Sequence, residues 1–206
     1  MKKLRFPLIK MMAIIPLLIF LSGCNPLEDE SKSNSILIIS SLMGTDLEGT
    51  EANYLQSDVV KVDPTTGAQT VIADVAKATL AAKRIEPVPP QLGSSQYNSI
   101  MLTRYVVSYT RSDKPNAIEG VDVPYSFEGS LSTLIEIDSS VTISFVIVRE
   151  VAKLEAPLIN LRQGGAEQVL EVTANVDFYG HDLANNAVKS TSTGKLSIFF
   201  ANYVND

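Results

Sequence analysis

Apolar and polar residues alternate with a period of two through most of the chain after Ser35. This period is typical of β-strands with one buried face, because successive side chains of a strand point to opposite faces of a sheet. The clearest apolar face is formed by Leu170, Val172, Ala174, Val176 and Phe178. Four further segments carry similar faces: Val141, Ile143, Phe145 and Ile147; Met101, Tyr105, Val107 and Tyr109; Leu131, Thr133, Ile135 and Ile137; and Leu196, Ile198 and Phe200. The pattern predicts an all-β fold.

The connections between these segments favour antiparallel neighbours, since they are rich in Gly, Pro, Asn and Asp and are mostly too short for a helical crossover. Residues 63–67 (Asp-Pro-Thr-Thr-Gly) predict a hairpin turn with Gly67 in the left-handed conformation. Residues 74–85 have two interpretations. Their Ala and Lys content favours a helix capped by Asp74, whereas the alternation of Ala78, Leu80 and Ala82 favours a strand. We favour the strand, because a lone helix fits poorly into an all-β chain.

The segment 87–99 is rich in Pro, Gly and Ser and has the composition of an interdomain linker or of a long loop. Residues 36–86, which precede it, are few for a separate core and contain no cysteine that could form a disulfide. We therefore predict a single antiparallel β-sandwich over residues 36–206.

The first 24 residues have the pattern of an export signal. Lys2, Lys3, Arg5 and Lys10 form a basic beginning, an apolar stretch runs from residue 11 to residue 21, and small residues precede Cys24. Eleven apolar residues rise only about 16 Å as a helix, at roughly 1.5 Å per residue, which is short of the ~30 Å hydrocarbon core. The stretch therefore favours a cleaved signal over a membrane-spanning anchor.

The end of this segment, Leu21-Ser22-Gly23-Cys24, resembles the lipobox of bacterial lipoproteins. In that family the cysteine thiol is alkylated by diacylglycerol, the peptide is cut just before the cysteine, and the new N-terminus is usually acylated. The resemblance implies a signal peptide over residues 1–23, lipid attachment at Cys24 and the bilayer as a partner. Asn25 stands where enteric lipoproteins that stay in the inner membrane carry Asp, which favours the outer membrane. Residues 24–35 are polar and acidic, and we expect a flexible tether there.

Charge and composition exclude several kinds of partner and site. The formal net charge is −6, and loss of residues 1–23 with their four basic and no acidic residues takes it to −10. No basic run lies beyond the first ten residues, which argues against nucleic acid. A single Cys and a single His exclude zinc sites built from several such ligands. We expect no metal and no cofactor.

His181 lies near two carboxylates, Asp177 and Asp182, and this is the one place where a carboxylate–His dyad or a small metal site could form. Asp177 belongs to the polar side of a predicted strand, and Gly180 is expected to begin a turn. These side chains therefore need not converge, and we favour a structural role for them.

The residues Asp182-Leu183-Ala184-Asn185-Asn186 resemble the Asp-x-Ala-Gly-Asn turn found near the end of many bacterial Ig-like and fibronectin type III-like domains. Asn185 stands where that family has Gly, and Asn tolerates positive φ better than most residues. The likeness covers about the last 40 residues. It implies an Ig-like sandwich with a spacer, adhesive or accessory role, and it transfers no catalytic residue.

The segment 120–129 carries a candidate partner-binding surface. Pro124 cannot donate to a sheet ladder, so an edge strand or a loop is expected here. Tyr125 and Phe127, spaced by two, are expected to point the same way, either outward as a binding rim or inward as a plug of the core. Asp113, Glu119 and Asp122 lie nearby without the spacing of a known calcium loop, and we interpret them as a solvated acidic loop.

These features favour a lipid-anchored, non-enzymatic protein of the cell envelope that acts as an accessory, structural or protein-interaction module. The alternative is a small-ligand or ion-binding lipoprotein associated with a transporter. An exposed apolar patch would favour the first function, whereas a concave pocket with converging polar groups would favour the second.

Overall fold

A computed structural model describes residues 33–85, 95–163 and 168–203. The predicted signal peptide, Cys24 and most of the predicted tether lie outside the described residues. The first strand, β1 (Ser35–Thr45), begins one residue before the predicted domain boundary. The segment 86–94, most of the predicted linker or loop, is also outside the described residues, but strands on both sides of it contribute to one core.

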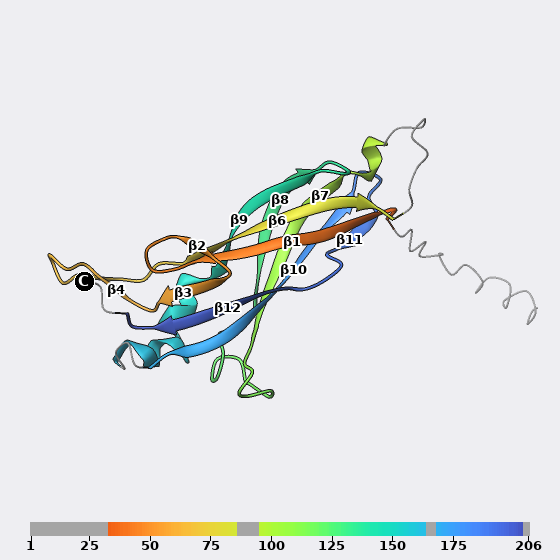
Figure 1. Cartoon of the computed structure of the whole chain (residues 1–206). Helices are drawn as coiled ribbons and strands as arrows, with labels where there is room; N and C mark the ends of the chain where they lie inside the picture. Colours follow the sequence, from red (N-terminus) through yellow and green to blue (C-terminus); the bar gives the residue numbers. More distant parts are fainter. Residues whose placement is uncertain (1–32, 86–94, 164–167, 204–206) are drawn as a thin grey trace, which may run out of the picture. The chain divides into compact units, whose positions relative to one another are not determined.

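The alternating segments form strands of two main sheets (Figure 1). A four-stranded sheet has the order β2-β1-β6-β9, in which β2 (Glu51–Ala52) and β6 (Asp74–Arg84) lie beside β1 and β9 (Ser140–Val148) pairs with β6. The larger sheet has the order β3-β12-β10-β7-β8, and β11 pairs with β10. Its strands are β3 (Tyr54–Asp58), β7 (Ile100–Thr110), β8 (Phe127–Ile135), β10 (Leu170–Asp182), β11 (Ala187–Lys189) and β12 (Gly194–Ala201).

The remaining elements are short. β4 (Lys61–Val62) and β5 (Gln69–Thr70) form the predicted hairpin, with Gly67 at φ 68°. The described residues also form three 3₁₀ helices, η2 (Gln96–Asn98), η3 (Glu150–Leu154) and η4 (Leu158–Gln163). In the part of the chain that the structure describes, no helix is long and apolar enough to cross a membrane.

The apolar faces of the two sheets meet in a shared core. The ring of Phe145, from β9, lies edge-on to Tyr105 of β7 at 4.9 Å and to Phe178 of β10 at 5.3 Å between ring centres. Such edge-to-face contacts between aromatic rings add to the stabilisation that burial supplies. The all-β prediction is confirmed, and residues 74–85 form a strand up to Arg84, as we favoured.

The pairing departs from a purely antiparallel arrangement at one edge. β12 runs parallel to β3, with Ser197 opposite Tyr54 and Ala201 opposite Asp58. β3 follows β1 and β2 of the four-stranded sheet in sequence but joins the edge of the larger sheet, where it lies beside β12, the last strand of the described residues. The larger sheet is therefore mixed.

One predicted strand face is wrong in its first residue. Met101 was expected to share a face with Tyr105, but Ile100 and Leu102 are the buried residues at the beginning of β7, and Met101 is half-buried. The register of β7 shifts against β8 between Leu102 and Arg104, and β10 shifts against β7 beside it. A β-bulge inserts one residue and so reverses the alternation. The predicted faces in β10 and β12 are buried throughout. In the other two faces Ile135, Ile143, Phe145 and Ile147 are buried, whereas Leu131, Thr133, Ile137 and Val141 are half-buried.

Candidate functional site

The two predicted partner-binding residues point in different directions. Phe127 is the first residue of β8, is buried, and lies edge-on to Tyr105 at 6.2 Å between ring centres. Tyr125 is 50% exposed and covers Gly120, where an added Cβ would lie 2.3 Å from its ring. The expectation that they share a direction is wrong, because β8 begins only at Phe127 and the alternation of a strand does not extend back to Tyr125.

The group around His181 does not converge. His181 lies within β10 rather than in a turn, because β11 pairs with β10 from Tyr179 to His181 and β7 pairs with it as far as Asp182. Its Nδ1 is 2.9 Å from the backbone oxygen of Asp182. The carboxylate of Asp177 instead lies 3.0 Å from the ammonium of Lys189. The described residues hold no group of three His, Cys, Asp or Glu side chains that could bind a metal.

Asp182 has a structural role in the turn that follows β10. One of its carboxylate oxygens accepts hydrogen bonds from the backbone N–H of Ala184 at 3.0 Å and of Asn186 at 2.8 Å. Burial alone would raise the pKa of Asp182, but the hydrogen bonds from Asn186, Ser33 and Ala184 outweigh it and hold the pKa below its usual value. Asn185 has φ 69°, as the resemblance to the Asp-x-Ala-Gly-Asn turn predicted.

Two acidic residues of the 113–122 loop, Asp113 and Asp122, are partnered by basic groups. Arg111 donates to Asp113 at 2.8 Å, and Lys114 donates to Asp122 at 2.8 Å. Asp122 also accepts from the backbone N–H of Ile118 at 2.9 Å. The side chain of Asp113 is exposed, as expected of a solvated loop, whereas that of Asp122 is only 12% exposed.

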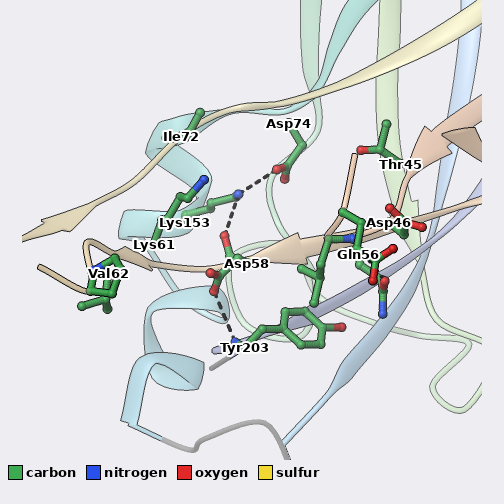
Figure 2. Close-up of a pocket in the computed structure, with 13 residues that line it drawn as sticks. Thr45, Asp46, Gln56, Asp58, Lys61, Val62, Ile72, Asp74, Lys153 and Tyr203 are labelled. Atoms are coloured by element: carbon green, nitrogen blue, oxygen red, sulfur yellow. Dashed lines mark hydrogen bonds and ion pairs between the residues drawn. The ribbon is translucent and has the colours of Figure 1, made fainter. Parts of the chain in front are cut away.

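A groove of about 720 Å³ lies where β1 ends (Figure 2). Its walls come from the segment after β1, from β3 and the β4–β5 hairpin, and from the beginning of β6. The lining residues are Thr45, Asp46, Leu47, Glu48, Gln56, Asp58, Lys61, Val62, Pro64, Ile72, Asp74, Lys153 and Tyr203.

A buried ion pair lies in the wall of this groove. Lys153, in η3, is 2% exposed, and its Nζ donates to Asp74 Oδ1 at 2.9 Å and to the backbone oxygen of Asp58 at 2.8 Å (Figure 2). Ser57 donates its hydroxyl to the other oxygen of Asp74 at 2.6 Å. Burial raises the pKa of Asp74, while Lys153 and the Ser57 hydroxyl oppose that rise. The pair therefore joins β3, β6 and η3 at the groove.

The rim of the groove combines apolar and acidic side chains. Leu47 and Ile72 are at least half exposed, and Glu48 is exposed beside Leu47. The four acidic side chains of the lining outnumber its two lysines. An open groove of this kind can bind a chain segment or a small molecule that offers apolar and cationic groups.

Sequence reasoning missed this groove because its parts are distant along the chain. Lys153 and Asp74 are 79 positions apart, and the segment around Lys153 carries no periodicity or motif that marks it as functional. Comparison with protein-family models and with curated proteins finds no match to this chain.

Proposed function

We propose that this chain is a lipid-anchored lipoprotein of the bacterial cell envelope whose β-domain acts as a non-catalytic binding module. The observation that carries the proposal is Leu21-Ser22-Gly23-Cys24, placed at the end of an apolar stretch and containing the only cysteine of the chain. Two or three acyl chains on Cys24 would anchor the protein stably, since each buried methylene contributes about 0.8 kcal/mol. Asn25 in place of Asp favours the outer membrane.

The direction of β1 supports a role in presenting a binding surface. β1 begins at Ser35, close to the tether, and ends at Thr45, which lines the groove. Eleven residues of strand span roughly 35 Å at about 3.3 Å per residue. The groove therefore lies at the end of the domain that is remote from Ser35, where a partner could reach it without competing with the anchor.

The groove is the best-supported place for that partner. Leu47 and Ile72 give it exposed apolar contacts, and its acidic excess favours a partner segment with Lys or Arg beside apolar residues. The exposed surface around Tyr125, which we call the Tyr125 surface, is a second candidate for the partner-binding site, although Phe127 is buried.

Site-specific photo-crosslinking in living cells tests the proposal. A benzoylphenylalanine at position 72 should give one discrete crosslinked product, and Leu47→Ser should abolish it. Val151→Ser is the matched control, because Val151 is also exposed but does not line the groove. A product formed only from position 125 would move the site to the Tyr125 surface, and no product from either position would contradict a partner-binding role.

The groove volume also favours a second candidate function, the binding of a small ligand. Small-molecule sites span about 300 to 1,000 Å³, and 720 Å³ falls within that range. Native mass spectrometry of the protein extracted from its own membranes would show a small bound mass that Leu47→Ser removes. A ligand-free protein together with a crosslinked protein partner would exclude this alternative.

A further inference from the structure

Four exposed apolar side chains lie at the end of the domain where β1 begins. We call them the basal patch: Ile85, Tyr97, Leu134 and Leu183. Their exposed fractions run from 41% to 68%, with Tyr97 the most exposed. Figure 1 shows the beginning of β1, the end of β6, η2 and the end of β10 at this same end of the domain. Four different parts of the chain thus bring apolar groups to one end.

Hydrogen bonds hold these parts together. The backbone N–H of Leu183 donates to Tyr97 O at 3.0 Å and to Ser99 O at 3.1 Å, which fixes the turn after β10 against η2. Leu134 and Leu183 line the same shallow hollow. The basal patch is therefore built on fixed backbone.

The tether joins the domain within this patch. Ser35 donates its hydroxyl to Asn98 O at 2.6 Å, beside Tyr97, and Ile85 donates its N–H to Asn34 O at 2.9 Å. Eight residues separate Cys24 from Ser33. Nine peptide steps reach at most about 32 Å, at ~3.6 Å per residue. An acyl group on Cys24 would therefore hold the basal patch within about 32 Å of the lipid.

We propose that the basal patch rests in the headgroup region of the bilayer, so that the domain stands on the membrane with its groove pointing away. This inference rests on the proposed lipid anchor. Tyr suits the interface between water and hydrocarbon because its ring is apolar and its hydroxyl is polar. Four side chains would bind weakly on their own, but the tether makes the contact intramolecular and so raises its effective concentration.

The negative charge of the domain limits which of its faces can contact a membrane. The chain from Cys24 onward has a formal charge of −10, which opposes broad contact of its sides with anionic headgroups. A small apolar end avoids most of that repulsion. The occupant is therefore a neutral lipid surface of the phosphatidylcholine or phosphatidylethanolamine type.

The absence of tryptophan from the chain allows a direct test with a single fluorescent reporter. The chain from Cys24 onward contains all of the compact unit that spans residues 32–206. Its only thiol can be coupled to maleimide-phosphatidylethanolamine in phosphatidylcholine vesicles, some with brominated acyl chains. Tyr97→Trp reports the basal patch, and Ile72→Trp is the matched control at the groove, with similar exposure.

We expect Tyr97→Trp emission to shift to shorter wavelength on coupling and to lose most of its intensity in brominated vesicles, while Ile72→Trp stays unchanged. Leu183→Trp gives a second reporter should Tyr97→Trp fail to fold by circular dichroism. Equal quenching of the basal and groove reporters, or none, would overturn the proposal. A concentration-dependent blue shift without lipid would overturn it too, since that would show a second copy on the patch. Because the lipid is attached chemically, the result is independent of whether cells acylate Cys24, which mass spectrometry reports separately.

Discussion

The ammonium of Lys153 lies 2.9 Å from Asp74 Oδ1 and is almost fully buried, although the two residues are 79 positions apart. Both ends of this pair are satisfied further, Lys153 by the backbone oxygen of Asp58 and Asp74 by the hydroxyl of Ser57. The pair fixes η3 against the beginning of β6 and the end of β3, and so sets the shape of the groove.

Breaking this pair on one side should strongly destabilise the fold. Removing one partner of a buried ion pair leaves an uncompensated charge and typically costs about 3–5 kcal/mol. Asp74→Ala should therefore lower the free energy of unfolding in urea by that amount. The matched control is Glu51→Ala, which removes the exposed ion pair with Lys77 and should cost less than about 1 kcal/mol. Equal losses would contradict the structural role of the buried pair.

Replacing both partners by apolar residues should recover most of the loss. Lys153→Met with Asp74→Leu removes both charges at once, and well-packed apolar replacements of buried ion pairs are often neutral or stabilising. The double variant should unfold at a higher urea concentration than Asp74→Ala alone. A double variant less stable than the single one would mean that the hydrogen bonds to Asp58 and Ser57 matter more than the paired charges.

Asp182 should make stability depend on acid. The pKa of Asp182 is lowered in the folded state, so the carboxylate binds fewer protons in the folded than in the unfolded chain. Its contribution to the stability of the fold is therefore fully present above the ordinary pKa of about 3.9. That contribution is lost as pH falls through the lowered pKa. Asp182→Ala should cost about 1–3 kcal/mol at pH 7, since it leaves N–H groups of the turn without acceptors.

The measurement is urea unfolding of the wild type and of Asp182→Ala at a series of pH values. The difference in free energy of unfolding between the two proteins should shrink as the pH falls below the ordinary pKa range of a carboxyl group. A difference that stays constant down to strongly acidic solution would show that the charge of Asp182 does not support the turn.

Phe145 lies in the hydrophobic core, where it contacts the rings of Tyr105 and Phe178 from the opposite sheet. Phe145→Ala should lower the free energy of unfolding by about 3–5 kcal/mol, because the truncation removes buried apolar atoms and leaves a cavity between the sheets. His181→Ala, with its side chain only half-buried, should cost much less. Comparable losses from the two variants, measured by chemical denaturation, would mean that the sheets do not meet at Phe145.

The sequence predicted the parts of the fold that depend on neighbours along the chain. The face from Leu170 to Phe178 follows from alternation within one strand, and the positive φ of Asn185 follows from turn chemistry. Met101 was misplaced because a bulge, which depends on the pairing of two strands, reversed its face. The Lys153–Asp74 pair had no local signal at all. The groove that this pair shapes depends on contacts between residues distant along the chain, which local sequence patterns do not predict.

The intact mass of the protein extracted from its own membranes shows whether Cys24 carries a lipid. We expect loss of residues 1–23 together with added diacylglycerol and acyl mass on Cys24, and we expect Cys24→Ala to accumulate as an unprocessed precursor. A soluble, normally cleaved product without acyl mass, or unchanged processing of Cys24→Ala, would contradict the account.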